Sequence, residues 1–475
     1  MVTVSNTLTG TGTLNVRTPE GLVIGNNTVN FGTINIGLTT PGRLILQPGF
    51  TGNIGALSAG ESPGNSFGDL YQLGGTLNIS GLCRVGHWPN ETSTYIMGGG
   101  TLNVTATPGG VVNLAGQPEQ PGVIYLGVDG TGILIQTGGV VRAHGIVFDG
   151  RGNTTGTDTF TLTGGETVIG PSGFKSGALD ANATYAINLG GGKITSSANW
   201  NSVLRMDLTG VNGNVTFDTA GFPSNVLSGP LVGGGGLTKT GAGSLYLFGA
   251  STYEGTTTLD QGALIVRGSI SGPVSVIGGN LFGNGVLHGP VTVLPGGSIN
   301  PDAGGSGLGT LTVNSALNLG GTTFMQIFNN NPGGSGLTND LITGTAAITY
   351  GGTLNVQLSG NLLTNQATFN LFDGVSFTGA FASIILPSLP GGLYWDTTKL
   401  TVDGTIRITG PQLAFSRAGN MLSLSWPADT MLQAQTNAPG VGLNENWVTV
   451  DTGGNSITIT VDPSVGSVFY RLIRP

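Results

Sequence analysis

One five-residue phrase recurs along this chain and limits its fold more than any other feature. The phrase is Gly-Thr-(Leu/Ile)-(Asn/Thr)-(Val/Ile), and it starts at Gly12, Gly32, Gly75, Gly100, Gly309 and Gly352. Its two apolar residues are two positions apart, so they share one face of a β-strand while the polar residues share the other. The glycine permits the positive φ of a sharp corner. Each copy therefore predicts a corner followed by a short strand with one buried face.

The spacing of the copies predicts that they stack. The steps from Gly12 to Gly32 and from Gly75 to Gly100 are each one period, and the step from Gly32 to Gly75 is close to two. A period of about 20 to 27 residues made of strands and glycine corners is typical of a solenoid, in which neighbouring coils bury each other's apolar faces. We expect Leu and Val to stack inside and hydrogen-bonded Asn ladders to form outside. At ~4.8 Å per coil, the segment up to Thr409 would form a rod of roughly 70 to 95 Å.

The predicted fold class is all-β: a parallel β-helix (β-solenoid) followed by a small C-terminal antiparallel β-sandwich. Segments such as "LVIGNN", "TFTLTGG" and "SLYLFG" alternate with period two, and helical periodicity is almost absent. A β-propeller is the rival fold, but its blades need ~40 to 50 residues and their own signatures, which this sequence lacks. From Pro411 the chain is poorer in glycine, and "MLQAQTN", "SITITVD" and "VFYRLI" are typical of antiparallel strands.

Composition and charge exclude several classes of function. Charged residues are 8%, the net charge is −8, and the 15 basic residues are dispersed. The chain thus offers no basic patch for nucleic acid or for an anionic membrane surface. No apolar run approaches the ~20 residues of a membrane-spanning helix, and the start "MVTVSNTLTG" lacks the features of a signal peptide. We therefore expect no nucleic acid partner and no membrane insertion.

The segment "GGGGLTKTGAGSLYLFGASTYEGTTTLDQGALIV", from Gly233 to Val266, resembles the autotransporter-associated β-strand repeat. That repeat has a glycine-rich lead, Leu-Thr-Lys-Thr-Gly, a short strand, Thr-Tyr-x-Gly-x-Thr and a closing Gly-x-Leu-x-Val. The residues on this pattern are Gly236, Leu237, Lys239, Gly241, Gly243, Leu245, Tyr253, Gly255, Thr256, Gly262 and Leu264. The resemblance extends to about Thr409. It implies a secreted or surface-located bacterial protein with a right-handed parallel β-helix.

This resemblance and the change near Pro411 predict three regions. Residues 1–231 are an N-terminal β-solenoid with glycine-corner repeats, residues 232–409 a β-solenoid resembling autotransporter-associated repeats, and residues 410–475 a β-sandwich module. The last region does not resemble the membrane barrel of roughly 250 or more residues that ends an autotransporter. We expect that the chain does not export itself through such a barrel, and that the sandwich caps the C-terminal end of the solenoid.

Two aspartates form the best candidate metal or sugar site. Asp129 and Asp149 lie about one period apart in the matching turns "DGTG" and "DGRG", with Arg142 and Arg151 nearby. One period would stack the two aspartates on one corner, where they could hold Ca²⁺. Asp-Gly is also a common turn dipeptide, and the plain turn is the favoured interpretation.

The stretch "CRVGHWPNE" is the only one with parts that resemble a nucleophilic site. It places Cys83 and His87 four positions apart, beside Trp88. Catalysis by a Cys–His pair normally joins residues distant in sequence and needs a third group that orients the base. A packed cysteine and a surface histidine are the favoured interpretation. We expect no catalytic, cofactor-binding or metal residue and no cofactor.

Three functions are compatible with these features. The favoured one is a non-enzymatic structural subunit of an extracellular bacterial filament or matrix. A carbohydrate-binding adhesin, with extracellular polysaccharide as its partner, would carry a line of exposed aromatic residues. Tyr71, Tyr95 and Tyr125 fall about one period apart, a spacing that also suits a stacked core. A polysaccharide lyase or hydrolase would need paired acids and bases in a cleft, which the 23 scattered acidic residues do not predict.

The N-terminal stretch "MVTVSNTLTGTGTLNV" predicts a partner. It opens directly in an alternating strand pattern, with no charge before Arg17. A terminal coil without a cap exposes N–H and C=O groups to which another chain can add a strand. Head-to-tail contacts of this kind do not close and therefore form fibres. We expect self-assembly through residues Met1 to about Val16, with a second copy of this chain as the partner.

Overall fold

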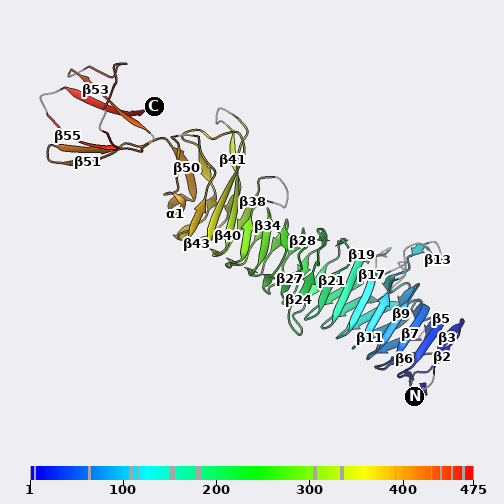
Figure 1. The fold of residues 1–475 in the computed structure, drawn as a ribbon. Helices are drawn as coiled ribbons and strands as arrows, with labels where there is room; N and C mark the ends of the chain where they lie inside the picture. Colours follow the sequence, from blue (N-terminus) through cyan, green and yellow to red (C-terminus); the bar gives the residue numbers. More distant parts are fainter. Residues whose placement is uncertain are drawn as a thin grey trace.

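The computed structural model describes residues 2–4, 7–61, 66–105, 112–114, 117–149, 156–177, 184–302, 307–331, 336–390, 392–428, 430–438, 441–450, 453–462 and 466–473. The chain forms a long stack of strands with its termini at opposite ends (Figure 1). Successive coils pair through parallel strands, which confirms the predicted parallel β-helix. No helix in the described ranges is long and apolar enough to cross a membrane; the single helix there, α1 (Leu400–Asp403), is one short turn.

Each coil contributes a strand to each of three faces. The first face is a ten-stranded sheet that continues as a six-stranded sheet. Its strands are β1 (Val2–Val4), β4 (Leu22–Ile24), β6 (Gly42–Leu46), β8 (Gly68–Gln72), β11 (Thr92–Met97), β16 (Thr131–Gln136), β18 (Thr157–Leu162), β20 (Thr184–Leu189), β23 (Met206–Leu208), β26 (Leu231–Val232), β29 (Ala250–Ser251), β32 (Ser269–Ile270), β35 (Val286–Leu287), β38 (Thr310–Val313), β42 (Leu341–Thr343) and β46 (Phe372–Asp373).

The second face consists of sixteen strands of a nineteen-stranded sheet, whose other three strands lie on the third face. Its strands are β2 (Leu8–Thr9), β5 (Thr28–Ile36), β7 (Thr51–Ala59), β9 (Thr76–Ile79), β12 (Thr101–Val104), β17 (Val140–Phe148), β19 (Glu166–Ser176), β21 (Lys193–Ser196), β24 (Val215–Asp218), β27 (Leu237–Thr240), β30 (Thr257–Leu259), β33 (Val274–Val276), β36 (Val291–Val293), β39 (Leu317–Leu319), β43 (Ala347–Tyr350) and β47 (Ser376–Gly379).

The third face begins with the bent second halves of the long strands β5, β7, β17 and β19 and with short strands that pair with them. It continues as a separate ten-stranded sheet, in which β41 (Leu337–Asn339) pairs antiparallel with β40. The other strands of this face are β3 (Thr13–Val16), β10 (Cys83–Val85), β15 (Val123–Leu126), β22 (Trp200–Ser202), β25 (Asn225–Leu227), β28 (Ser244–Leu247), β31 (Ala263–Val266), β34 (Gly279–Gly283), β37 (Gly297–Asn300), β40 (Thr322–Asn329), β44 (Thr353–Gly360) and β48 (Ser383–Ile385).

The repeated phrase stacks in register, but on more than one face. Leu14 lies over Ile34 on the third face, and Leu77 lies over Leu102 on the second. The copies that begin at Gly309 and Gly352 lie in β38 and β44, on the first and third faces. A strand with one apolar side fits any face, because each face turns one side of its strands toward the core. The phrase therefore marks a corner and a strand, and not a fixed position in the coil.

The length of a coil varies more than the sequence predicted. Leu237 pairs with Thr257, and Thr257 pairs with Val274. The second of these steps is shorter than the predicted range. Leu102 pairs with Val141, a step much longer than that range, because the intervening chain leaves the coil and forms the hairpin of β13 (Val112–Leu114) and β14 (Gln117–Glu119). Only the strands must stay in register, so corners absorb insertions and deletions.

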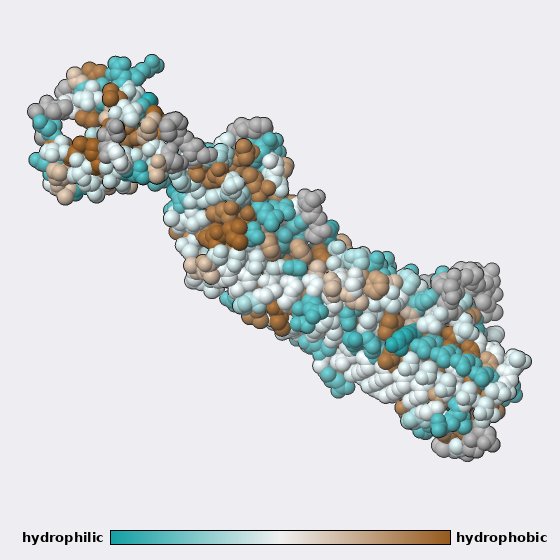
Figure 2. Space-filling view, in the orientation of Figure 1, coloured by the Kyte–Doolittle hydropathy of each residue, from teal (hydrophilic) through white to brown (hydrophobic). Residues whose placement is uncertain are grey.

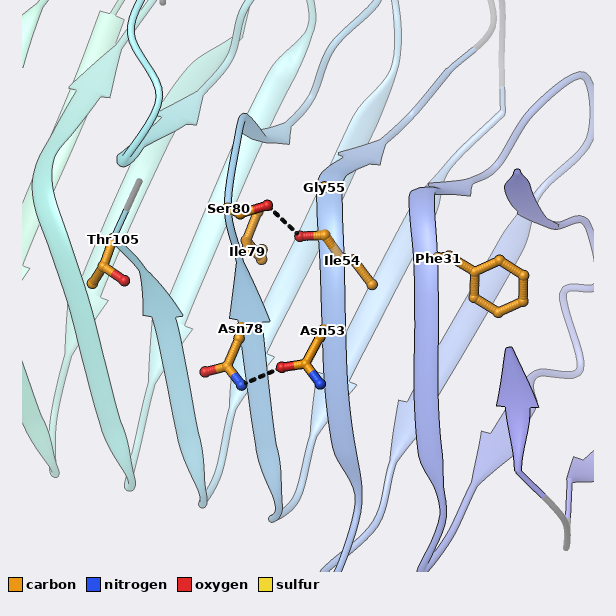
Figure 3. A pocket seen from close by; sticks show the side chains of 8 residues that line it. All are labelled: Phe31, Asn53, Ile54, Gly55, Asn78, Ile79, Ser80 and Thr105. Atoms are coloured by element: carbon orange, nitrogen blue, oxygen red, sulfur yellow. Dashed lines mark hydrogen bonds between the residues drawn. The ribbon is translucent and has the colours of Figure 1, made fainter. Parts of the chain in front are cut away.

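The predicted Asn ladder is confirmed on the outside of the second face. The side-chain amide of Asn53 donates to Asn30 at 3.0 Å, Asn78 to Asn53 at 2.8 Å, and Asn103 to Asn78 at 2.8 Å. Figure 3 shows the Asn78–Asn53 step. Because the coils repeat at the spacing of a β-sheet, each amide meets the next one at hydrogen-bond distance.

A cap closes the C-terminal end of the core, but the sandwich does not form it. The strands β45 (Thr368–Asn370), β50 (Thr405–Thr409) and β49 (Tyr394–Asp396) make an antiparallel sheet. Phe369, Ile406 and Ile408 from its inner side and Leu400 from α1 join the main core. The expectation that the module after Pro411 would cap the solenoid is therefore wrong, because apolar residues before it already cover the open end.

The predicted C-terminal β-sandwich is confirmed. One sheet contains β51 (Ala414–Ala418), β52 (Met421–Ser425) and β55 (Ser456–Thr460); the other contains β54 (Val448–Thr449), β53 (Met431–Asn437) and β56 (Ser467–Ile473). Leu424, Trp426 and Leu432 form a small core between the sheets, separate from the core of the β-helix. Apolar side chains remain on the surface of this module (Figure 2). Phe415 among them is 76% exposed.

Candidate functional site

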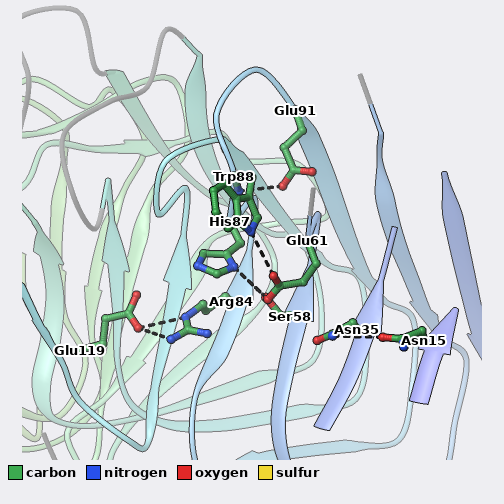
Figure 4. A network of polar contacts seen from close by, with 9 residues as sticks. All are labelled: Asn15, Asn35, Ser58, Glu61, Arg84, His87, Trp88, Glu91 and Glu119. Carbon is green, nitrogen blue, oxygen red and sulfur yellow. Dashed lines mark hydrogen bonds and ion pairs between the residues drawn. The ribbon is translucent and has the colours of Figure 1, made fainter. Parts of the chain in front are cut away.

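Buried charges gather at one corner of the β-helix, beside β10 (Figure 4). Arg84, His87, Glu91 and Glu119 are all at least nine-tenths buried there. The guanidinium of Arg84 donates from Nε and Nη2 to Glu119 Oε2 at 3.0 and 2.5 Å. This ion pair fastens the β13–β14 hairpin to the outside of β10. In a chain with 8% charged residues, such a cluster of buried charges is a candidate functional site.

The cysteine of this corner is packed in the core. Cys83 is fully buried, and burial raises the pKa of its thiol to about 12. A thiol that does not ionise near neutral pH is a packing residue. The packed cysteine is therefore confirmed. The expected surface position of His87 is wrong, because that residue is only 6% exposed.

His87 instead contacts a serine and a glutamate that sequence reasoning did not single out. Its Nδ1 lies 3.2 Å from Ser58 Oγ and 2.9 Å from Glu61 Oε1. A catalytic triad places the serine at one ring nitrogen of the histidine, which takes the serine proton, and the acid at the other ring nitrogen, where it orients the ring and stabilises the imidazolium. Here Ser58 and Glu61 share one nitrogen, so these three residues do not form a triad.

The pKa values of Glu61 and Glu91, two glutamates of this corner, are shifted in opposite directions. Burial alone would raise the pKa of Glu61, but the hydrogen bonds and charge of His87 and the hydrogen bonds of Ser58 and Trp88 lower it to about 2. Burial raises the pKa of Glu91 to about 8, against the opposing hydrogen bond from the Trp88 amide at 3.1 Å. Glu91 Oε2 is buried without a hydrogen-bond partner. Two neighbouring carboxyls with pKa values shifted apart are found in acid–base sites, but other coils of this β-helix hold carboxyls with raised pKa values as well.

Two aspartates on other coils accept backbone amides as Glu91 does. Asp158 accepts the amides of Gly132 and Asp149 at 2.9 and 3.0 Å, and burial raises its pKa to about 7. Asp340 accepts the amides of Gly309 and Gln326 at 2.8 and 2.7 Å, and burial raises its pKa to about 6. Each carboxyl satisfies one N–H group at a corner and one in a strand, Gly132 in β16 or Gln326 in β40, that stacking leaves inside the protein. Glu91 therefore belongs to a set of corner caps.

The aspartates considered as a calcium site do not stack on one another. Leu126 pairs with Phe148, which sets Asp149 level with Gly127 and not with Asp129. Asp149 turns with φ +51° and donates its amide to Asp158. Within the described ranges, no three His, Cys, Asp or Glu side chains are placed to hold a metal ion. Arg151 lies outside the described residues.

The lysine of the recognised repeat has a structural position. Lys239 is fully buried, and its ammonium donates to the carbonyls of Thr240, Gly241 and Gln261 at 2.7, 2.8 and 3.0 Å. Burial lowers its pKa to about 8. The ammonium satisfies carbonyls of two successive corners, as the carboxyls satisfy amides elsewhere. Lys239 is thus the cationic form of a corner cap.

The three tyrosines do not form a line. Tyr95 lies in the core, and its hydroxyl donates to Gln72 at 2.5 Å. Tyr71, on the outside of β8, has the Arg43 guanidinium 5.4 Å from its ring centroid. Tyr125 lies on the third face, and its hydroxyl accepts the Gln120 amide at 2.7 Å. The aromatic row of the adhesin hypothesis is therefore wrong for these residues, because equal spacing along the sequence does not fix the face or the side of a strand.

A shallow hollow of about 620 Å³ lies beside the Asn ladder (Figure 3). Its lining consists of Phe31, Asn53, Ile54, Gly55, Asn78, Ile79, Ser80 and Thr105. None of these side chains ionises near neutral pH, so the hollow offers no general acid or base.

The fold defines the class of this protein, and comparison with known protein families identifies one of its repeats. The parallel β-helix with glycine corners defines the class of solenoid proteins. Residues 237–266 match the model of the passenger-associated-transport-repeat family. The resemblance deduced from the residues of this segment is therefore confirmed.

Two curated proteins are similar to parts of the chain. The extracellular serine protease of Serratia marcescens is 36% identical over 148 residues, which are 30% of this chain and 13% of that protein. The adhesin BmaC autotransporter of Brucella suis biovar 1 (strain 1330) is 27% identical over 238 residues, which are 48% of this chain and 6% of that protein. The chain thus spans only a small fraction of the length of either relative.

Proposed function

We propose that this chain is an extracellular, passenger-type β-helix of a bacterium that acts as a non-catalytic structural rod. The observation that carries the proposal is the use of its buried charges. Glu91, Asp158, Asp340 and Lys239 all serve as caps for backbone groups at corners. Similarity to an extracellular protease and to an autotransporter adhesin supports the location outside the cell.

Serine-dependent catalysis is the sharpest alternative, because one relative is a protease and Ser58 contacts a histidine. Incubation of the purified chain with a fluorophosphonate probe tests it, since this probe labels activated serines. We expect no labelling of the chain while a trypsin control is labelled. Labelling that is lost in Ser58→Ala would contradict the non-catalytic role.

The location can be tested separately on intact cells that produce the chain. We expect immunogold particles at the cell surface, and we expect added protease to remove them. Signal that appears only after the cells are opened would contradict an extracellular rod.

We also propose that the rod joins a second copy of itself end to end. At the first coil, β1 and β3 are the outermost described strands of their faces, and Val2 is 57% exposed. At the last coil β48 is outermost on the third face, with Ile385 52% exposed. Parallel addition of β3 to β48 would continue the sheet.

Electron microscopy and sedimentation test this assembly. We expect the full chain to form filaments, and the double variant Val2→Lys with Thr13→Lys, at two exposed residues of the outermost strands, to remain monomeric, because charges on an edge strand oppose pairing. Phe415→Lys with Val448→Lys, which adds the same charge at two exposed residues of the sandwich, is the control and should still assemble. Monomers of the full chain at high concentration would refute the proposal.

A further inference from the structure

A pocket of about 530 Å³ lies where the cap of the β-helix meets the linker to the sandwich. Its floor is the outer side of the antiparallel ribbon of β49 and β50. Trp395 and Ile408 face inward and pack on the core, so the alternating residues Tyr394, Asp396, Arg407 and Thr409 face outward. The pocket therefore stands on a ribbon whose other side is held by core packing.

The polar groups of this floor are held in place before any ligand arrives. Arg407 donates from Nε and Nη2 to Asp396 Oδ2 at 2.7 and 2.6 Å. Thr398 donates its amide and hydroxyl to Asp396 Oδ1 at 3.0 and 2.6 Å. Hydrogen bonds from Thr398 and then from Arg407 hold the pKa of Asp396 at about 2. The carboxylate is thus ionised and fixed, while the Arg407 side chain remains 46% exposed.

The lining combines an aromatic ring, hydroxyls and a balanced ion pair. Tyr394 is 38% exposed, and Thr397, Thr398, Thr409 and Gln412 supply hydroxyl and amide groups. Among the described residues that line the pocket, only Asp396 and Arg407 are charged near neutral pH, and their charges cancel. A ligand for such a pocket needs an apolar face for the ring and many hydroxyls for the polar groups, with no net charge.

We infer that this pocket binds a neutral oligosaccharide. The C–H face of a pyranose stacks on Tyr394, and its hydroxyls bond to the exposed edge of Arg407 and to the threonines and Gln412. The volume of the pocket is within the usual range for small-ligand pockets. The inference goes beyond the structural role, because a rod without this activity would still be a rod.

Isothermal titration calorimetry with the full chain tests the inference. The probes are neutral tetrasaccharides of glucose, mannose, galactose and N-acetylglucosamine, with tetragalacturonic acid as the charged comparison. We expect at least one neutral probe to bind. Tyr394→Ala should weaken it about tenfold or more, and Tyr394→Phe should retain most of the affinity.

Phe248→Ala is the matched control, because Phe248 is 43% exposed and has an arginine, Arg267, 5.5 Å from its ring centroid. This variant should bind like the wild type. Circular dichroism should show the same strand content in all variants. The inference is wrong if no neutral probe binds, if only tetragalacturonic acid binds, or if Tyr394→Ala and Phe248→Ala behave alike. None of these outcomes would change the test for serine labelling or surface location.

Discussion

The coils before residue 177 and the coils of the passenger repeat satisfy their buried corners with different chemistry. In the earlier coils a neutral amide, Gln136, donates to the carbonyls of Gly139 and Glu166 at 3.3 and 2.9 Å, and Glu91 and Asp158 accept amides. In the repeat, the charged Lys239 donates to three carbonyls. The difference teaches that stacking fixes which backbone groups are left inside, but not which side chain must meet them.

What the two regions share is the glycine corner, and its removal should have the largest effect. A Cβ at Gly100 would lie 2.2 Å from the carbonyl oxygen of Gly75, and one at Gly262 would lie 2.3 Å from that of Gly241; both glycines have positive φ. We expect Gly100→Ala and Gly262→Ala each to lower the free energy of unfolding by about 3 kcal/mol or more.

Denaturant melts monitored by circular dichroism would measure this loss. Gly234→Ala is the control, because nothing lies within 4 Å of its Cβ position and its φ is not positive. A similar loss in all three variants would show that corner geometry is not the cause.

Replacement of the two donor caps, Lys239 and Gln136, should distinguish the two regions by the pH dependence of their stability. We expect Lys239→Met and Gln136→Leu each to cost roughly 2 kcal/mol, since each leaves buried carbonyls without a donor. Only the lysine should bring a pH dependence. Its folded pKa of about 8 lies below the unfolded value of 10.5, so the unfolded chain binds more protons between these pH values.

The wild type should therefore gain stability as pH rises from about 8 to 10.5, and Gln136→Leu should gain as well. Lys239→Met should lack this gain. Chemical denaturation at about pH 7.5 and at pH 10.5 would measure it, and an equal gain in all three proteins would rule out Lys239 as its source.

The acceptor caps should give the opposite pH dependence. The folded pKa values of Asp158 and Glu91, about 7 and 8, lie above the unfolded values of 3.8 and 4.5. The folded chain then binds more protons, so their contribution is full at acid pH and declines as pH rises from about 4 to 8. We expect Asp158→Asn to cost about 1–2 kcal/mol at about pH 5 and less at about pH 8. Unfolding at the two pH values measures this difference; a larger cost at the higher pH would contradict the assignment.

The Asn ladder, which belongs to the earlier coils, should have the smallest effect. Asn78 bonds to Asn53 and Asn103, whereas Asn103 makes one bond in the ladder. We expect Asn78→Ala to cost about 1 kcal/mol and Asn103→Ala about half as much, because these bonds are exposed to water. Thermal melts of both variants would show the order, and equal losses would show that the ladder bonds are not the source of the stability difference.

Much of the fold could be predicted because each copy of the repeat carries the pattern of a strand and a corner within a few residues. Alternation with period two and glycines at the corners require strands with one buried side, and their recurrence requires stacking. The Asn ladder follows from the same register. Lys239 and its neighbours identified the passenger repeat because its motif is contiguous in sequence.

The candidate sites could not be predicted in the same way, because their partners meet only across coils. Glu61 reaches His87 26 residues away, and Arg84 reaches Glu119 35 residues away. No local pattern marks these pairs, and the spacings of about one period between Asp129 and Asp149 and between the tyrosines predicted contacts that do not form. Corners of unequal length shift the register, so distance along the chain does not measure distance between coils.

The sequence by itself determined the unit: an apolar-sided strand, a glycine corner and the need for a neighbour. The tertiary structure decided the face on which each copy lies, the carboxyl or ammonium group that satisfies each buried corner, and the segment that caps the core. The physical reason is that strand formation depends on residues within one coil. Burial and the partners of buried polar groups depend on two or more coils at once.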